Sequence, residues 1–238
     1  MKKQGSLYTV IYIIIIVVLV GTALAATSMA LKDRQNENIA ADKMKQILAS
    51  VHIVPEPGQK VSEVFNKYIT AQTVVNSQGE ETGTDAFSVN VQEQSKIADG
   101  AKRQLPVYIC TLPVAGTKYI IPVYGAGLWG PIWGYVAVDA DGDTVYGAYF
   151  SHEGETPGLG AEIAREPFQK QFEGKELYKG GQFKSIGVMK AGQKPTNGED
   201  CVDAISGGTI TSRGVESMLK GCMGAYDAFF KQLQSESK

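Results

Sequence analysis

The chain has 238 residues, of which 43% are hydrophobic and 20% are charged, and its formal net charge is −2. This length suits one domain with a smaller appendage, and it is sufficient to bury a core without metal ions or disulfides. The composition excludes a collagen-like chain, a wholly disordered chain and a disulfide-rich miniprotein. A nucleic-acid-binding protein is not expected, because neutralising phosphates requires a surplus of basic residues.

The first 31 residues predict a membrane anchor preceded by a short cytoplasmic stub. No charged residue lies among the 28 positions between Lys3 and Lys32, which include the apolar run 8–30. About 20 apolar residues cross a bilayer as a helix. Because Lys2 and Lys3 are the charges that precede this run, the positive-inside rule places the N-terminus in the cytoplasm. The rest of the chain, whose net charge is −4 once these two lysines are left out, is then extracytoplasmic.

A cleaved signal peptide is the alternative interpretation of the same run. The tripeptide Ala23-Leu24-Ala25 has the small-x-small form of a cleavage site. The charged cluster at 32–34 follows the run directly and is typical of a stop to membrane insertion. We therefore expect a retained single-pass anchor, and under either interpretation the bulk of the protein is exported.

Residues 32–104 are expected to form a helical and irregular part close to the membrane. Apolar residues recur at helical spacing in 33–51 and again in 61–69, which predicts two helices. Two prolines interrupt the chain between them. The polar, glycine-containing stretch 76–83 predicts a loop or an excursion between strands.

Residues 105–238 form the second part, in which the hydrophobic pattern changes to period two. Alternating apolar residues predict four strands, and Asp141-Gly142 predicts a hairpin turn between the last two. The expected elements are strands at 107–112, 118–123, 132–139 and 144–150, a loop at 151–164, a short helix at 168–172, a strand at 183–189, a loop at 192–200 and an amphipathic helix at 212–233. The sequence therefore predicts an α+β fold, in which helices pack on a mixed or antiparallel sheet.

The three cysteines, Cys110, Cys201 and Cys222, are too few and too scattered for a disulfide framework or a zinc site. Without a Cys-x-x-Cys pair, ligation of an iron–sulfur cluster by this chain is not expected, and no metal site is predicted. We expect the cysteines to be small buried side chains. Pairing of Cys201 with Cys222 in an oxidising compartment stays open.

The segment 203–211, which reads DAISGGTIT, comes directly before the C-terminal helix. Its two glycines permit unusual backbone angles and a close approach of a bound group. The free N–H groups and partial positive charge of a helix N-terminus suit a phosphate, and Arg213 adds a full charge nearby. The segment therefore predicts an anion site. The alternative left open by the residues is an ordinary hydroxyl N-cap after a turn.

A serine hydrolase is not expected, and no catalytic residue is predicted. The G-x-S-x-G nucleophile elbow is absent, because position 204 is alanine. The chain contains only two histidines, His52 and His152, from which a Ser-His-Asp triad would have to be built.

Segment 203–211 also resembles the flavinylation motif D-x-x-[ST]-G-A-T-x-[ST]. In the family that carries this motif, a flavin transferase attaches FMN through its phosphate to the final hydroxyl residue. Thr211 stands at that position in this chain. The departure from the motif is Gly208, where the family usually has alanine, and the loss of one methyl group should be tolerated.

Two upstream segments extend the resemblance, YGAGLWGPIWGYV at 124–136 and HEGETPGLG at 152–160. Both are similar to signatures of the C subunits of the sodium-translocating NADH:quinone reductases, the family of subunits with covalent FMN, and the resemblance covers the whole chain. The G subunits of the Rnf electron-transport complexes share E-T-P-G-L-G and the flavin motif, but they usually lack the Gly-Leu-Trp-Gly string found here at 127–130. The reductase family is therefore favoured, and membership of an Rnf-type ferredoxin:NAD complex is the alternative.

The resemblance implies that the second part of the chain, 105–238, binds FMN, held by a phosphoester to Thr211. The helix dipole, the amides of 207–210 and Arg213 would stabilise the remaining phosphate charge. Apolar side chains would cover the ring faces, while Glu155 and Thr156 would bond the ring edge. The residues expected to bind the cofactor are Leu128, Trp129, Glu155, Thr156, Leu159, Gly160, Ser206, Gly207, Gly208, Thr209, Ile210 and Thr211.

The resemblance also implies a one-electron relay at a bacterial inner membrane, within a larger complex. Iron–sulfur-bearing subunits would supply the electrons, the FMN-bearing B subunit in the membrane would receive them, and quinone would be the final acceptor. A flavin transferase would be needed for maturation. No NADH site is expected in this chain, because no G-x-G-x-x-G opens a helix after a strand. An anchored extracytoplasmic binding module without a redox cofactor is the alternative from another class.

Overall fold

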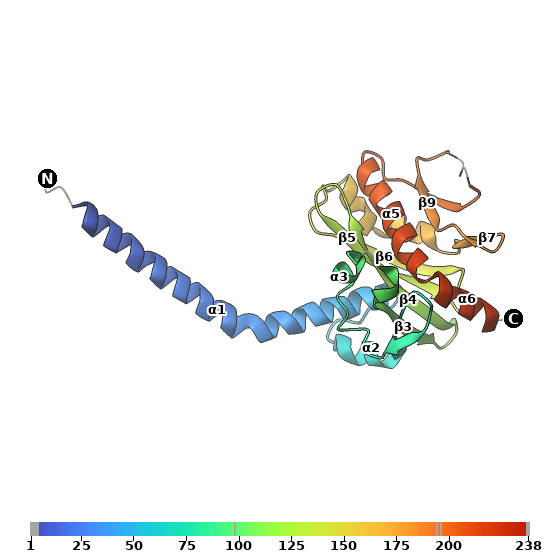
Figure 1. The fold of residues 1–238 in the computed structure, drawn as a ribbon, viewed down its shortest axis with the longest axis horizontal. Helices are drawn as coiled ribbons and strands as arrows, with labels where there is room; N and C mark the ends of the chain where they lie inside the picture. The colour runs from blue at the N-terminus through green and yellow to red at the C-terminus, as the bar shows by residue number, and fades with distance from the viewer. Residues whose placement is uncertain (1–4, 98, 194, 196, 237–238) are drawn as a thin grey trace. The chain divides into compact units, whose positions relative to one another are not determined.

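The computed structural model describes residues 5–97, 99–193, 195 and 197–236. The chain divides into two compact units, Met1–Lys43 and Met44–Lys238, which are described separately. The first unit consists of most of one long helix, and the second contains the sheet and the remaining helices (Figure 1).

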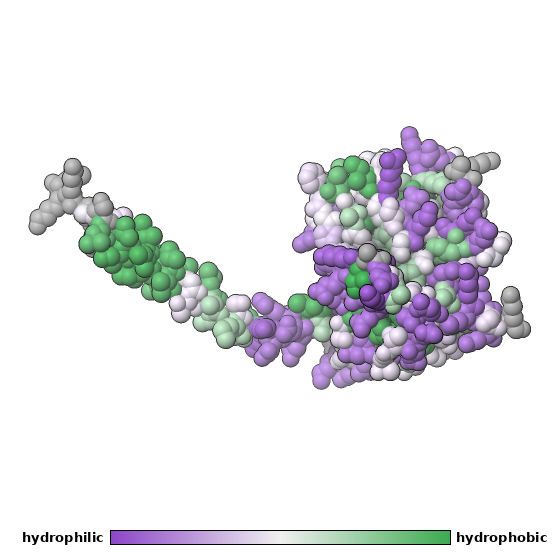
Figure 2. Space-filling model, viewed as in Figure 1, coloured by the Kyte–Doolittle hydropathy of each residue, from purple (hydrophilic) through white to green (hydrophobic). Residues whose placement is uncertain are grey.

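The helix α1 spans Ser6–Ala49 without interruption. The expected anchor and the expected helix at 33–51 are therefore parts of the same element. Figure 2 shows hydrophobic side chains along the N-terminal half of α1 and hydrophilic ones beyond it. By length and composition, α1 is able to cross a membrane. The helix ends where His52 adopts a left-handed φ of 61° and the Ile53 N–H donates to the Leu48 carbonyl.

Six antiparallel strands form the main sheet, in the order β2-β1-β3-β4-β5-β6. The strands are β1 Ile69–Val75, β2 Glu81–Gly83, β3 Leu105–Leu112, β4 Gly116–Ala126, β5 Pro131–Asp139 and β6 Val145–His152. The α+β class and the antiparallel sheet are confirmed, and the four expected strands correspond to β3–β6. β1 was not expected, and β2 lies inside the stretch 76–83 that we expected to be a loop or an excursion between strands. They extend the sheet beyond β3, because β1 pairs with β3 and β2 pairs with β1, and this pairing overrides a weak local pattern.

The remaining elements cover the sheet or extend it. They are α2 Val61–Tyr68, α3 Val91–Ser95, η1 Gly100–Lys102, η2 Gly160–Ala164, α4 Glu166–Gln169, η3 Lys170–Phe172, β7 Tyr178–Lys179, β8 Gln182–Phe183, β9 Ile186–Met189, β10 Asp200–Asp203, α5 Thr209–Ala225 and α6 Asp227–Glu236.

Three local expectations are corrected by the structure. The strand expected at 183–189 is divided into β8 and β9, because Ser185 adopts a positive φ of 64°. The loop expected at 151–164 is shortened by the end of β6 and by η2, and the loop expected at 192–200 ends where β10 begins, at Asp200. The single helix expected at 212–233 begins earlier, at Thr209, and is divided at Tyr226, whose φ of −93° and ψ of 9° end α5.

Both faces of the sheet are covered by other elements, which explains why consecutive residues along its central strands are apolar. On β4, Ile120 belongs to the core on one face, and its neighbour Ile121 belongs to the core on the other. Successive side chains of a strand point to opposite faces, so both alternate positions are apolar here. The helices α5 and α6 cover the Ile121 face, whereas the end of α1 and the helix α2 cover the Ile120 face.

The end of α1 is also attached to the sheet by a polar contact. The indole N–H of Trp133 on β5 donates a hydrogen bond of 3.0 Å to Gln46 Oε1. Ile47 and Leu48 of the same turn are fully buried. The last turns of α1 therefore form part of the folded domain.

The helix α5 lies unusually close to β4. A Cβ atom added at Gly214 would collide with the carbonyl oxygen of Ala126, and one added at Gly125 would lie 2.7 Å from Cβ of Met218. Real Cβ atoms do not approach other heavy atoms so closely, so glycine is required on both elements. This contact fixes the start of α5 beside the turn that joins β4 to β5.

We predict that Gly214→Ala destabilises the folded domain by about 1–3 kcal/mol, because it forces an extra carbon into a close backbone contact. Gly221→Ala on the same helix is the matched control, since a Cβ atom there meets nothing within 4 Å. It should stabilise the domain by about 0.5–1 kcal/mol through helix propensity. Urea unfolding of the full chain in detergent, followed by tryptophan fluorescence, measures both. Equal effects of the two substitutions would contradict the close packing.

Candidate functional site

Three segments that are distant in the sequence enclose a pocket of about 230 Å³. They are the turn between β4 and β5, the loop that follows β6, and the start of α5. The residues that line it are Leu128, Trp129, Glu155, Thr156, Leu159, Gly160, Gly207, Gly208, Thr209, Ile210 and Thr211. The structure thus brings together all of the expected cofactor-binding residues except Ser206. Ser206 lines a neighbouring cavity with Asp203 and Phe168.

A buried hydrogen bond joins two of these segments at the base of the pocket. The Thr211 hydroxyl donates to Glu155 Oε2 over 2.6 Å. Thr211 is 1% exposed and Glu155 is 5% exposed. A length of 2.6 Å is typical of a hydroxyl that donates to an ionised carboxylate. In this structure the carboxylate faces Thr211, and a bond from Glu155 to a ring edge stays a prediction.

The second oxygen of Glu155 is held by the turn between β4 and β5. Oε1 accepts a hydrogen bond of 2.9 Å from the backbone N–H of Trp129, and the N–H of Leu128 also bonds the carboxylate. Burial raises the pKa of this carboxyl, but the hydrogen bonds from Thr211, Trp129 and Leu128 lower it, as does the nearby His152. The net result is a pKa below the ordinary value for glutamate. Glu155 is therefore an ionised carboxylate at neutral pH.

Two glycines leave the space that this carboxylate occupies. A Cβ atom at Gly127 would collide with Glu155 Oε1, and one at Gly160 would collide with Glu155 Oε2 and with the Thr211 hydroxyl. Gly127 was not among the expected site residues. The signal that could have identified it is its place at the start of the Gly-Leu-Trp-Gly string.

The first turn of α5 begins without a side-chain cap. Gly208 is the N-cap residue, and no side chain bonds the free N–H groups that follow it. The hydroxyl of Ser212 instead accepts a hydrogen bond from the N–H of Ile205. The ordinary hydroxyl N-cap that the sequence left open is therefore not formed. The uncapped N–H groups and the helix dipole keep this end of the helix suited to an anion.

The glycine pair before α5 shapes the approach to the helix. Gly207 has a φ of 74°, in the left-handed region that favours glycine. A Cβ atom at Gly208 would lie 3.1 Å from the side chain of Ile205, so an alanine there needs only a small adjustment. The backbone at Gly208 is thus compatible with the alanine that the flavinylation motif usually has at this position.

Large apolar side chains stand exposed around the mouth of the pocket. Trp129 is 68% exposed, Ile210 57%, Leu128 48% and Leu159 43%. These side chains come from all three segments that form the pocket. Exposed apolar side chains gathered around one pocket are typical of a binding surface, because they cost solvation energy unless a ligand or a partner covers them.

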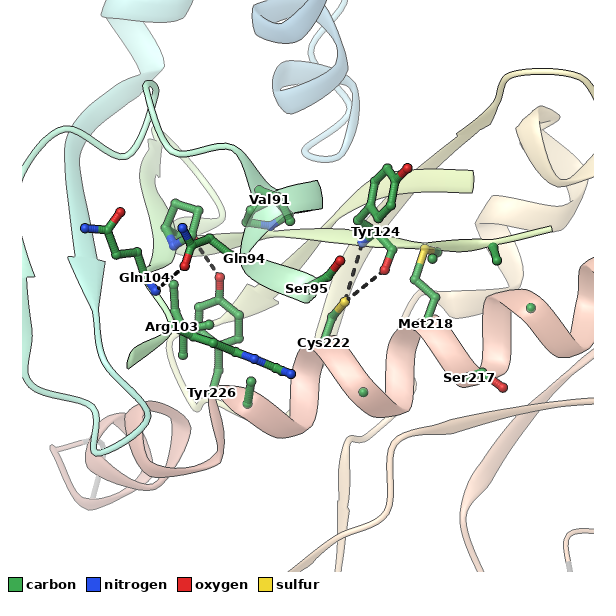
Figure 3. A pocket seen from close by; sticks show the side chains of 18 of the residues that line it. Val91, Gln94, Ser95, Arg103, Gln104, Tyr124, Ser217, Met218, Cys222 and Tyr226 are labelled. Carbon is green, nitrogen blue, oxygen red and sulfur yellow. Dashed lines mark hydrogen bonds between the residues drawn. The ribbon is translucent and has the colours of Figure 1, made fainter. Parts of the chain in front are cut away.

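A larger cavity of about 530 Å³ lies between α3, β4 and α5 (Figure 3). It contains none of the expected cofactor-binding residues. Its walls are joined by the hydrogen bonds drawn in Figure 3, such as that from the Tyr226 hydroxyl to the Pro106 carbonyl. Arg213 lines this cavity rather than the pocket at Thr211, so the expected support of a phosphate by Arg213 is not built into the pocket.

The cysteines contribute no covalent link to either cavity. Cys110, Cys201 and Cys222 are free thiols, so the pairing of Cys201 with Cys222 that the sequence left open is not formed. The Cys222 sulfur contacts the backbone of Tyr124 at 3.4 Å. Burial raises the pKa of the Cys222 thiol, so this cysteine is a packed neutral group.

Comparison with known proteins agrees with this site. Residues 127–224 match the family described as the FMN-binding domain, and this range contains the whole pocket at Thr211. The crystal structure of the C subunit of Na(+)-translocating NADH-quinone reductase from Parabacteroides distasonis is 42% identical, with a TM-score of 0.77, over 84% of this chain and 96% of that one. The structure of NqrC from Shewanella oneidensis is 25% identical, with a TM-score of 0.69, over 83% and 99%.

A curated relative extends the likeness over nearly the full length. The C subunit of the Na(+)-translocating NADH-quinone reductase of Vibrio anguillarum is 34% identical over 231 residues, which cover 90% of this chain and 89% of the relative. The relatives are reductase subunits, so the comparison favours the reductase over the Rnf alternative. The chain therefore belongs to the NqrC family, the C subunits of the Na+-translocating NADH-quinone reductases.

Proposed function

We propose that this chain carries FMN covalently, through a phosphoester to Thr211, and that it relays single electrons within the reductase complex. The observation that carries the proposal is the position of the Thr211 hydroxyl. It lines the pocket of an FMN-binding domain, in the first turn of a helix whose N-terminus has no side-chain cap. A phosphate attached there lies beside free N–H groups and the positive end of the helix dipole.

The residues around the pocket fit a flavin. Leu128, Trp129, Leu159 and Ile210 offer exposed apolar surface for a planar ring. Thr156 and Thr209 add polar groups at the same mouth. Bound FMN supplies the redox chemistry, including one-electron transfer, while the protein sets its position, exposure and electrostatic surroundings.

The proposed partners follow from the family. As one member of a larger complex, the chain would receive electrons from iron–sulfur-bearing subunits and pass them to the FMN-bearing B subunit in the membrane, on the way to quinone. The apolar helix α1 would retain it in the bacterial inner membrane, with the sheet domain on the extracytoplasmic side. A flavin transferase would modify Thr211 after export.

The modification is tested by the mass of the purified full chain after co-expression with a flavin transferase. We expect a gain equal to one FMN less one water, and flavin fluorescence that survives a denaturing gel. Thr211→Ala should lose both signals, because it removes the attacking hydroxyl. Ser217→Ala is the matched control, since Ser217 is an exposed hydroxyl residue on the same helix that lies outside both the motif and the pocket and should leave the mass gain intact. An unmodified wild-type chain would instead favour a binding module without a covalent cofactor.

The orientation is tested by labelling single cysteines with a membrane-impermeant maleimide in spheroplasts. Val114→Cys places a thiol at a side chain that is fully exposed in the sheet domain, and it should label before lysis. Lys3→Cys should label only after lysis, because the positive-inside rule places it in the cytoplasm. The wild-type chain gives the background from its own cysteines. The opposite labelling pattern would place the domain in the cytoplasm.

A further inference from the structure

The hydrogen bond between Thr211 and Glu155 has a fixed direction in the unmodified protein. A carboxylate has only acceptor oxygens, so the proton of the 2.6 Å contact belongs to the Thr211 hydroxyl. Esterification of Thr211 removes this proton. The Thr211 oxygen then becomes an acceptor only, and a phosphate anion stands next to it.

Two acceptors at such a short distance repel each other unless a proton lies between them. The carboxylate has little room to turn away. Its Oε1 accepts a hydrogen bond from the backbone N–H of Trp129, and the N–H of Leu128 also bonds the carboxylate. Gly127 and Gly160 lie so close to the carboxylate that a Cβ atom on either would collide with it. Retention of this packing requires that a proton replaces the one lost from Thr211.

The charges around Glu155 also favour protonation after modification. No lysine or arginine lines the described part of the pocket, and Arg213 on α5 faces the other cavity. The turn between β4 and β5 contributes no titratable side chain beside Glu155. On its own loop, Glu153 is exposed, and the Nδ1 atom of His152 accepts a hydrogen bond from the N–H of Glu155. His152 lowers the pKa of Glu155 in the unmodified protein, and esterification adds an anionic neighbour without a further cationic one, which favours the neutral form of this buried carboxyl.

We propose that Glu155 is a proton-binding site of the mature protein: it keeps a proton when Thr211 is esterified and, as a carboxylic acid, donates it back to the ester oxygen. This inference rests on the proposed function. In the step, a bond forms between the Thr211 oxygen and the flavin-bearing phosphorus of a flavin dinucleotide, the pyrophosphate bond breaks, and a nucleoside monophosphate leaves with the electron pair. The hydroxyl proton is retained on Glu155, and nothing is oxidised or reduced.

The exchange leaves the loop after β6 bonded to α5 in both states. In the unmodified protein Thr211 donates to Glu155, and in the modified protein Glu155 donates to Thr211. The mature site therefore contains an ionisable group in direct contact with the linkage of the cofactor. Because the group is buried, water screens it little, and a change in its charge acts on the flavin.

The test is carbon-13 NMR of the full chain in detergent, with labelled glutamate side chains and sequential assignment of the Glu155 carboxyl signal. Unmodified and modified wild-type proteins are compared at neutral pH, with the modification checked by mass. We expect the Glu155 carboxyl signal at the carboxylate position in the unmodified protein and at the carboxylic acid position in the modified protein. The Glu153→Gln variant is the matched control, because it removes an exposed acid two residues away and should leave this shift unchanged.

A Glu155 signal that stays at the carboxylate position in fully modified protein would overturn this inference and leave the proposed function intact. A wild-type chain that gains no mass would overturn both. Glu155→Gln adds a second measurement. The glutamine amide donates a hydrogen bond at every pH and does not ionise. The pH dependence of the flavin midpoint potential should therefore lose the contribution that ionisation of Glu155 makes in the wild-type protein. An effect on folding alone would not cause this loss.

Discussion

The hydrogen bond between Thr211 and Glu155 is the contact on which the pocket depends. It joins the start of α5 to the loop after β6, and the other oxygen of the carboxylate joins that loop to the turn between β4 and β5. Both residues are almost completely buried, so loss of either partner would leave a polar group without water to replace it. One carboxylate therefore holds three segments in register, and Gly127 and Gly160 are required because any larger residue would displace it.

The sheet supplies the rigidity that this contact needs. Its central strands are packed on both faces, so they have little freedom to shift relative to α5. The backbone contacts at Gly125 and Gly214 then set the distance between β4 and α5. As a result, the position of the first turn of α5 is determined by the packing of the sheet rather than by the loop that precedes the helix. An anion site built on that turn is held in place by the core.

Local patterns predicted much of this arrangement, and contacts between distant segments account for the rest. Strands β3–β6 follow from alternation, and the residues around Thr211 follow from the motif that precedes the helix. β1 pairs with a strand thirty or more residues further along the chain, and no local signal specifies that pairing. Likewise, the role of Glu155 as a partner of Thr211 depends on tertiary contacts between residues 56 positions apart. Ser206 belongs to the same motif but lines a different cavity, so its place in the motif did not predict its position in the structure.

The small size of the pocket gives a physical reason for the covalent attachment that we propose. Ligand pockets usually enclose about 300–1,000 Å³ and bury most of a ligand, whereas this pocket has about 230 Å³ and its apolar side chains remain half exposed. A flavin ring in such a site would bury less of its surface than a ligand in a pocket of the usual size. A phosphoester makes retention independent of that burial. A ring attached in this way would keep an exposed edge, which suits the proposed transfer of electrons to a neighbouring subunit.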